Sequence, residues 1–537
     1  MRGSQWLLRT YRAVCSLLSL PAILVGAFTV AYFAATCDLA SLKPLRDDEL
    51  TTYEIAALPT AGDVWSAWFE SPDGLPPVIH LTTHFIGSAL GFSHVIARLP
   101  DTVGFWLMCV CVFIFLSRRV SPMLAWVGML LPVTVPAAYF YAYEARGYGM
   151  VLAFSGAAVV CWDLAHHTRW RRVALLGLPI LLAAAIATHL YAVLVVVPLA
   201  LAELARTMER RQVDWWVWMG LAVVALLFLP ANPVISRIHR LPWVVQYSDG
   251  HRVSLPQLMA LPLQFLSIPA TYFGLLALVC VCRDRMSRPD DLTSLTTRDA
   301  RPPLSDWVLV IGLMALPAIG WSFAYLVTGV LLFRYVLAAV IGFSLGIALL
   351  CRVAVRRRPE IALLLAAWVA VTAAGSTVAT RYGARTTLTT AHIAAGSGCF
   401  RLLNVWGKLP PDGLPIAVSA FDLFTQIHHY APDALKQRLV FLVDRGKFGA
   451  QIEAMAPFYA KVFGEHIEGL EQFVRSHRSF YLYDCGGIGK LPILDWLLSA
   501  GASLRDSGLV ETTDTLLRRE LYRVSMTDGS TESAIGR

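Results

Sequence analysis

Charged side chains are scarce in this chain. They make up 15% of its 537 residues, whereas 56% of the residues are hydrophobic. A soluble domain carries about 25% charged residues, so this composition excludes an ordinary soluble protein. The apolar residues form long runs separated by short basic stretches. A bilayer requires this arrangement, because a helix needs about 20 apolar residues to cross roughly 30 Å of hydrocarbon.

The signatures of metal, redox and nucleotide sites are also missing. The ten cysteines form no CxxC pair and no metal-ligand spacing, so we interpret them as small packing residues rather than a disulfide framework. His80 and His84 are four residues apart, but Leu81 stands where the zinc-protease motif needs Glu. The glycine-rich segment 484–490 lacks the first glycine and the Ser or Thr of a phosphate loop.

Eleven apolar segments predict transmembrane helices, because in lipid each backbone polar group must be satisfied within its own segment. The first is too long for a signal peptide and has no clear cleavage site. They run approximately over residues 14–36, 100–117, 122–142, 147–165, 173–188, 190–205, 214–232, 262–281, 307–328, 335–351 and 360–379.

Every second connection between these segments is rich in arginine. The basic connections lie at 2–12, 118–119, 169–172, 206–211, 283–288 and 352–358. Cytoplasmic loops carry such an excess, so we expect the N-terminus in the cytoplasm, the C-terminal tail outside, and a multi-pass protein of the inner (plasma) membrane. The net charge of +8 is then an orientation signal and predicts no nucleic-acid partner.

The tail alternates short apolar runs with amphipathic stretches, which is typical of a small α/β domain. We therefore divide the chain into a membrane domain over 1–379 and a soluble extracytoplasmic domain over 380–537. Strands are predicted over 415–420, 438–443, 480–483 and 520–525, and helices over 423–430, 449–463, 469–475 and 491–498.

The first outer loop, residues 37–97, is long for a connection between two helices, and long loops tend to be functional. Between Cys37 and Ile79 it holds eight acidic residues against Lys43 and Arg46 alone. Residues 50–69 and 77–90 have helical patterns but are too short or too polar to cross. We expect two helices along the membrane surface.

The sharpest acidic cluster follows the first span as Asp47-Asp48-Glu49. A carboxylate near the bilayer surface could remove a proton from an acceptor hydroxyl while a sugar is transferred. The alternative is a helix N-terminus, where acidic residues favour the helix dipole and cap free N–H groups.

Other candidate residues lie at the outer ends of the predicted spans. An arginine there can bind phosphate through two donors, although an ion pair within the Glu144–Arg146 segment is an alternative. Asp73 precedes a diproline turn, which by itself explains the motif. A lone histidine such as His189 is often an interface residue. The candidates for substrate binding are Asp73, Glu144, Arg146, His189, Tyr191, Arg334 and Tyr335.

Together these motifs resemble the GT-C superfamily of membrane glycosyltransferases. The closer likeness is to the bacterial RgtA/B/C/D-like branch, and a more distant one is to protein O-mannosyltransferases and the lipid A aminoarabinose transferase. The likeness covers about residues 10–350. Two departures are Leu75, where relatives often have His, and Gly147, where Pro is usual and whose glycine predicts a softer turn. The matching motifs are Asp48-Glu49, Asp73 to Pro77 with His80-Leu81, Arg98-Leu99-Pro100, Glu144 to Tyr148, Thr188 to Tyr191 and Arg334-Tyr335.

The resemblance implies an all-α polytopic GT-C membrane domain joined to the soluble α/β domain. It implies an inverting transfer of a sugar from a polyprenyl-phosphate carrier, with Asp48 as the base and Asp47 or Glu49 positioning it. Arg146 and Arg334 would hold the carrier phosphate, and Asp73 would line the acceptor side. Many relatives need no metal, so no metal and no cofactor are expected. The acceptor is unknown.

Two other classes of protein remain open. A transporter or flippase of lipid-linked sugars should show ionisable residues near the membrane midplane and repeated halves. A non-catalytic subunit for cell-envelope assembly would keep the fold without the base.

Overall fold

The computed structural model describes most of the chain and divides it into two compact units. Unit 1 comprises residues 1–41, 75–233 and 251–380, and unit 2 comprises residues 42–74, 234–250 and 381–537. Unit 2 thus combines the tail with the first part of the predicted outer loop. The described residues are 21–46, 48–71, 74–167, 169–228, 254–266, 271–272, 274–278, 302–355, 359–386, 406–443, 450–484, 493–507 and 520–526.

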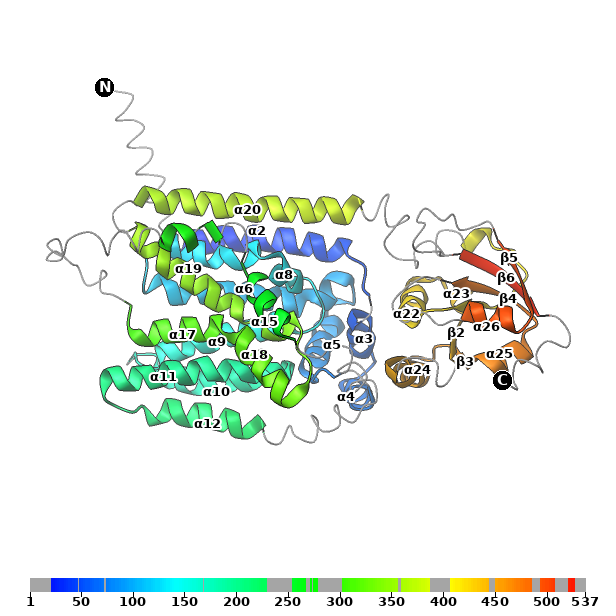
Figure 1. Ribbon diagram of the computed structural model, residues 1–537, viewed down its shortest axis with the longest axis horizontal. Helices are drawn as coiled ribbons and strands as arrows, with labels where there is room; N and C mark the ends of the chain where they lie inside the picture. Colours follow the sequence, from blue (N-terminus) through cyan, green and yellow to red (C-terminus); the bar gives the residue numbers. More distant parts are fainter. Residues whose placement is uncertain are drawn as a thin grey trace, which may run out of the picture. The chain divides into compact units, whose positions relative to one another are not determined.

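The described elements of unit 1 are all helical, as predicted for the membrane-spanning part of the chain (Figure 1). Among the described residues, five helical stretches are long and apolar enough to cross a membrane. They are Pro21–Leu42 (α2), His94–Ser117 (α6), Arg171–Thr188 (α10), Leu190–Arg210 (η3 and α11) and Ile361–Tyr382, within α20 (Pro359–Thr386). Shorter apolar helices are α5 (Val78–Leu90), α9 (Tyr148–Leu164), α12 (Trp215–Phe228) and α19 (Ala339–Val355).

Two of the predicted spans are bent. Helix α7 (Pro122–Leu130) continues through η1 (Leu131–Thr134) and then turns by 75° into α8 (Pro136–Tyr139) and η2 (Phe140–Ala142). Helix α17 (Leu304–Met314) turns by 54° into α18 (Leu316–Phe323) and η7 (Ala324–Thr328). Pro132, Pro136 and Pro317 lie at these bends, where a proline lacks the N–H that would continue the helix.

The edges of two other predicted spans cannot be compared completely. The first, 14–36, begins outside the described residues, and α2 continues to Leu42. The eighth, 262–281, starts inside α15 (Leu255–Leu263), and residues 267–270, 273 and 279–281 lie outside the described part of the chain.

Helices α6 and α9 pack most closely in unit 1, because glycine lets their backbones approach. A Cβ atom on Gly104 would lie 2.4 Å from the carbonyl carbon of Gly149, and one on Gly149 would lie 2.1 Å from the carbonyl oxygen of Asp101. Small residues at such a crossing are typical of membrane helix pairs. This crossing places the start of α9 beside α6.

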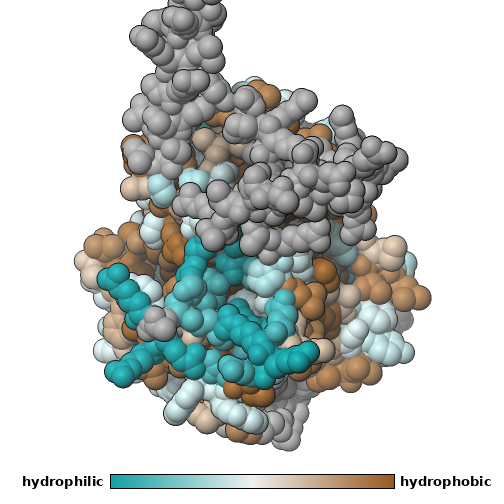
Figure 2. All heavy atoms as spheres, turned by 90° about the vertical axis from the view of Figure 1, so that its left-hand side faces the viewer, coloured by the Kyte–Doolittle hydropathy of each residue, from teal (hydrophilic) through white to brown (hydrophobic). Residues whose placement is uncertain are grey.

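At the opposite end of α6, an ion-pair network ties three helices together. Arg119 donates to Asp306 at 2.6 Å and to Asp163 at 2.7 Å. Burial alone would lower the pKa of Arg119, but the hydrogen bonds to Asp306 and Asp163 raise it above its usual value. The network borders a polar cavity of about 310 Å³. Hydrophilic side chains gather on this end of the unit (Figure 2).

Unit 2 contains a six-stranded sheet with the order β3-β2-β1-β4-β6-β5. The four strands β3, β2, β1 and β4 are parallel neighbours, and β6 pairs antiparallel with β4 and β5. All three residues of β1 are buried, as expected for a parallel strand covered on both faces. The strands are β1 (Ile416–Val418), β2 (Leu439–Val443), β3 (Ile467–Gly469), β4 (Ser479–Asp484), β5 (Ala502–Asp506) and β6 (Glu520–Met526).

The predicted α/β character of the tail is confirmed. Strands β3 and β5 were not predicted, because neither contains a sustained apolar run. The helices are α22 (Phe421–Tyr430), α23 (Asp433–Lys436), α24 (Ala450–Phe463), α25 (Leu470–Ser476) and α26 (Ile493–Ser499).

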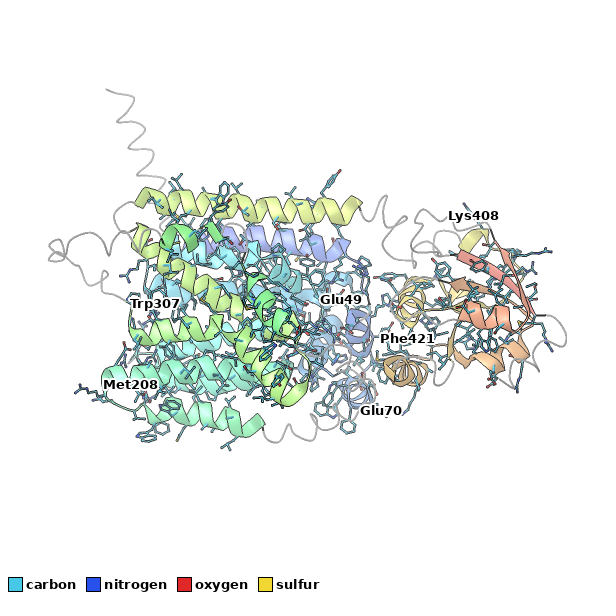
Figure 3. The ribbon with its side chains drawn as sticks, viewed as in Figure 1. Glu49, Glu70, Met208, Trp307, Lys408 and Phe421 are labelled. Carbon is cyan, nitrogen blue, oxygen red and sulfur yellow. The ribbon has the colours of Figure 1, made fainter. Side chains whose placement is uncertain are left out.

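The predicted helix over 50–69 is two helices in unit 2, α3 (Asp48–Ala56) and α4 (Ala61–Glu70). Pro59 and Thr60 separate them. Thr60 starts α4 through a capping box, in which its hydroxyl accepts from the Asp63 amide and the Asp63 carboxylate accepts from the Thr60 amide. Figure 3 labels Glu49, in the first turn of α3, and Glu70, at the end of α4.

Candidate functional site

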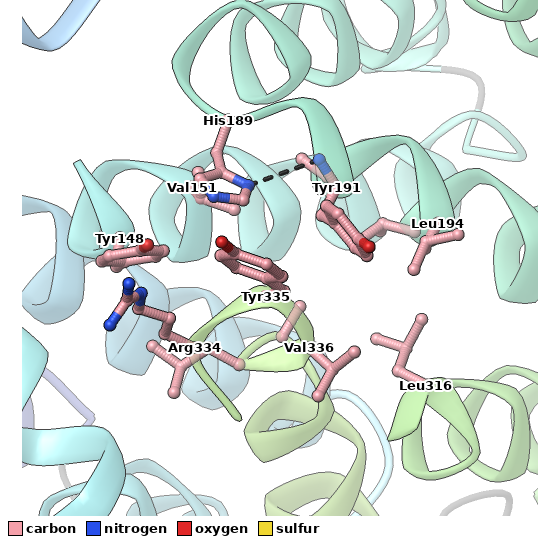
Figure 4. Close-up of a pocket in the computed structure, with 13 residues that line it drawn as sticks. Tyr148, Val151, His189, Tyr191, Leu194, Leu316, Arg334, Tyr335 and Val336 are labelled. Atoms are coloured by element: carbon pink, nitrogen blue, oxygen red, sulfur yellow. Dashed lines mark hydrogen bonds between the residues drawn. The ribbon is translucent and has the colours of Figure 1, made fainter. Parts of the chain in front are cut away.

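A narrow aromatic pocket lies in unit 1, where four non-contiguous segments meet, one of them contributing Leu316 of α18 (Figure 4). Tyr148 begins α9, His189 and Tyr191 flank the start of η3 (Leu190–Val195), and Tyr335 belongs to η8 (Phe333–Val336). The His189 ring is 5.2 Å from that of Tyr148 and 5.0 Å from that of Tyr335, measured between centroids. The rings of Tyr191 and Tyr335 are 4.6 Å apart.

Hydrogen bonds hold the rings of this pocket in place. The Nδ1 atom of His189 accepts from the backbone N–H of Tyr191 at 3.3 Å. The Tyr191 hydroxyl donates to the carbonyl of Val330 at 2.5 Å and also bonds to the Thr328 hydroxyl. The segment after the π-helical turn η7 is therefore tied to η3.

Two arginines lie beside the same aromatic group. The Arg334 side chain points toward Tyr148, and its guanidinium carbon lies 5.8 Å from the centre of the Tyr335 ring (Figure 4). Arg146 is 8% exposed and stands two residues before Tyr148 in the sequence. The cavity itself is only about 10 Å³, roughly the room that one water molecule needs. A phosphate group would enter only if side chains moved.

The turn that carries Arg146 is anchored by a residue that the sequence motifs did not single out. The buried carboxylate of Asp101, on α6, accepts backbone N–H bonds from Arg146, Gly147, Gly149 and Met150 at 2.7–3.3 Å. It therefore caps the N-terminus of α9 from a neighbouring helix. An acidic residue inside an apolar segment was the available signal, because such residues are costly in lipid unless they are satisfied.

Gly147 has a left-handed backbone with φ of 76°. Proline is fixed near −65° and could not adopt it. The softer turn predicted at this glycine stays a prediction, and the structure shows that Asp101 binds the amides on both sides of the turn. Leu75, the other departure from the family pattern, is buried in an apolar cluster with Ile79 and Met150.

The described acidic candidates after the first span belong to unit 2. Asp48 is the first residue of α3 and is partly exposed. Glu49 is buried and forms an ion pair of 3.0 Å with Lys43, whose side chain is 12% exposed. Asp47 and Asp73 lie outside the described residues.

The candidates thus fall into two groups. Arg146, His189, Tyr191, Arg334 and Tyr335 gather around Tyr148 in unit 1, whereas Asp48 and Glu49 belong to unit 2. Glu144 is half-buried, and its backbone carbonyl accepts from the Arg146 amide at 2.9 Å.

Histidines 80 and 84 are both buried on α5. Within the described ranges, no three His, Cys, Asp or Glu side chains are grouped so that they could hold a metal ion.

The chain has the architecture expected of the GT-C fold, an all-helical membrane unit and an α/β tail. No protein-family model and no curated protein matches the sequence. Among solved structures, the chain is similar to ArnT from Cupriavidus metallidurans bound to undecaprenyl phosphate. That alignment has a TM-score of 0.56 at 14% identity and covers 95% of this chain and 99% of ArnT. At this identity the likeness shows the fold. The apo state of the same ArnT aligns with a TM-score of 0.44.

Proposed function

We propose that this protein is a glycosyltransferase that moves a sugar from a polyprenyl-phosphate carrier to an acceptor hydroxyl at the outer face of the inner membrane. The observation that carries the proposal is the aromatic pocket itself, which Arg334 lines together with Tyr148, two residues after the buried Arg146. The shared fold supports the same donor class, because the solved ArnT structure is bound to undecaprenyl phosphate.

The two arginines match the charge changes of the reaction. The acceptor oxygen attacks the anomeric carbon, the bond from that carbon to the phosphate oxygen breaks, and the configuration inverts. The carrier leaves as polyprenyl phosphate with additional negative charge. Donors placed where charge develops stabilise a transition state, and guanidinium groups bind phosphate through paired N–H donors. Arg146 and Arg334 would hold this phosphate, with Tyr148, His189 and Tyr335 lining the cavity.

Asp48 is our proposed base. Its carboxylate would take the proton that the acceptor hydroxyl loses. Glu49 is engaged with Lys43, which favours a structural role for it. For Asp73, an acceptor-side role stays a prediction.

The transporter alternative calls for ionisable groups within the spans, and Asp101 is one. Its carboxylate, however, accepts four backbone N–H bonds, which is what a helix-capping residue does. A proton relay or substrate site would need a group with bonding capacity to spare. This observation favours the transferase over the transporter.

We further propose that the N-terminus is cytoplasmic and the tail is outside, because the basic connections alternate along the sequence. A reporter fused after Arg537 should be active only when it functions outside the cytoplasm. Activity of a strictly cytoplasmic reporter at that position would reverse the topology.

The decisive experiment uses the purified full-length protein in lipid vesicles. A panel of polyprenyl-phosphate sugars is supplied with a membrane extract as the source of acceptors, and release of free polyprenyl phosphate is measured with transfer of labelled sugar. We expect transfer without any nucleotide. Mass spectrometry of envelope glycans and glycoproteins after gene deletion would then identify the acceptor. Efficient transfer from a nucleotide-sugar with the lipid donor inert would overturn the proposal.

A further inference from the structure

In unit 2, hydrogen bonds hold together two segments that are far apart in the sequence, and we call this contact the joint. The segment 45–52, which we call the acidic segment, follows the first span and carries Asp48. It packs within unit 2 against α22 and α24 of the tail. The hydrogen bonds between the two join residues that are 381 to 408 positions apart.

The tail binds both backbone polar groups of Leu45. The Tyr430 hydroxyl accepts from the Leu45 amide at 2.7 Å, and the Gln426 side-chain amide donates to the Leu45 carbonyl at 3.1 Å. Leu45 is fully buried and Gln426 is 4% exposed. Because both the amide and the carbonyl of Leu45 are bound, the position of the backbone just before α3 is defined.

A second anchor lies on the other side of Asp48. The hydroxyls of Thr51 and Tyr459 are 2.6 Å apart in a buried contact, and these residues are 2% and 1% exposed. Further along α3, the Glu54 carboxylate lies 3.6 Å from Nδ1 of His429, whose ring packs edge-on against Tyr53. The two hydroxyl anchors, at Leu45 and Thr51, therefore bracket Asp48 three residues away on each side.

We propose that the C-terminal domain positions the general base, with Tyr430, Gln426 and Tyr459 as positioning residues. This inference rests on the proposed function, because it takes Asp48 as the base. The three side chains touch the backbone or a neighbouring hydroxyl of the acidic segment and leave the Asp48 carboxylate partly exposed. Their effect is to fix the first turn of α3 in place.

The chemical consequence follows from the distance dependence of catalysis. A base must lie within hydrogen-bond reach of the proton that it removes, and a displacement of about 1 Å can cost on the order of 100-fold in rate. A short helix attached only at its ends would not hold a carboxylate to that tolerance. Donor binding does not depend on this placement, so weakening the joint should lower kcat and leave KM for the donor unchanged.

The test compares matched removals of one hydroxyl in the full-length protein. Tyr430→Phe and Tyr459→Phe delete the two anchoring hydroxyls. The ring at 459 keeps its packing against Phe421 and Phe463, with centroids at 5.2 and 4.9 Å. Tyr481→Phe is the control, because its hydroxyl donates to Asp412 at 3.1 Å within the same domain. Amide hydrogen exchange of residues 45–52 and steady-state kinetics are measured on each.

In the double variant Tyr430→Phe/Tyr459→Phe we expect exchange over 45–52 to rise about tenfold and kcat to fall about tenfold, with KM for the donor within about twofold. The amides of the β-sheet should exchange as slowly as in the wild type. Tyr481→Phe should match the wild type in both exchange and kinetics. Thr51→Val should lower kcat as Tyr459→Phe does, because both remove the contact between the two hydroxyls.

The exchange measurement separates this inference from the proposed function. Unchanged exchange over 45–52 in the double variant would show that the two hydroxyls do not hold the acidic segment, whether or not sugar transfer is observed. Faster exchange with unchanged kcat would overturn the positioning role. If the wild type transfers no sugar from a lipid donor, the proposed function fails, and positioning of its base fails with it.

Discussion

The arginine pocket of unit 1 and the acidic segment of unit 2 are held by different kinds of contact. In the pocket, aromatic rings pack around His189, and the turn bearing Arg146 is bound by the carboxylate of Asp101. In the acidic segment, neutral hydroxyl and amide groups bind the chain on both sides of Asp48. In the first region a buried carboxylate binds backbone amides, and in the second the bound segment carries Asp48 as the first residue of a short helix.

This difference separates two tasks of a transferase. A phosphate-binding pocket must tolerate an anion that changes its charge during the reaction, and a rigid set of donors does this well. A general base must approach a variable acceptor, so its position has to be defined while its carboxylate stays accessible. Mutations in the two regions should therefore have distinct kinetic signatures.

The largest effect is expected at Asp48. Asp48→Asn keeps the size and polarity of the side chain but removes the base, so kcat should fall about 10²–10⁴-fold. Asp63→Asn, on α4 of the same unit, is the control for a lost acidic residue and should leave kcat within about twofold. Steady-state transfer from a lipid donor measures both. Near-normal turnover of Asp48→Asn, together with loss of activity in Glu49→Gln, would move the base to Glu49.

Arg334 should show the opposite kinetic signature. Arg334→Ala removes a phosphate donor, so the donor KM should rise and kcat/KM should fall about 10- to 100-fold, as expected for loss of a charged hydrogen bond. Arg334→Lys keeps the charge but loses the paired donors, and we expect an intermediate value. Titration with the lipid donor distinguishes the cases. If Arg334→Ala left both kcat and the donor KM unchanged, this side chain would be excluded from phosphate binding.

The two regions also differ in how far the sequence predicted them. The pocket residues lie in local motifs beside the predicted span ends, so Arg146, His189 and Arg334 could be named from their residue types and positions. The partners of the acidic segment could not. Tyr430, Gln426 and Tyr459 are ordinary helix residues in the sequence, and only the fold brings them to Leu45 and Thr51.

The same limit applies to backbone geometry. Hydrophobic periodicity predicted most span positions and the α/β tail, because burial dominates both. The prolines at the two bends are visible in the sequence, but the bend angles of 75° and 54° and the left-handed turn at Gly147 could not be predicted from periodicity. Asp101 was overlooked because its four N–H partners come from a segment more than 40 residues away.

Variants of Asp101 test whether the turn that carries Arg146 must be held in place. Asp101→Asn replaces one acceptor oxygen by an NH₂ group that faces backbone donors. Hydrogen bonds to a charged group contribute about 1.5–3 kcal/mol, so unfolding free energy should fall by about 2 kcal/mol. The thermal midpoint of the purified protein measures this loss. Asp101→Ala should cost more, since the amides of Gly147 and Gly149 then lose their acceptor. A neutral effect of both variants would show that other groups fix the turn.

The smallest expected effect concerns Glu465, a buried residue of unit 2. His428, Glu54 and Lys436 lie nearby. Burial, aided by the negative charge of Glu54, raises the pKa of Glu465 to about 9, and burial lowers that of His428 to about 4. Between about pH 4.5 and 9 the folded protein keeps a proton on Glu465 that the unfolded chain has lost, so stability decreases as pH rises through this window.

Glu465→Gln cannot ionise and should melt a few degrees higher than the wild type at pH 8, with the difference vanishing near pH 4.5. Glu471→Gln, an exposed change on α25, should show no such trend. Thermal melts across this pH range measure the difference, and a gain that shrinks as pH rises would mean that Glu465 is ionised in the folded protein.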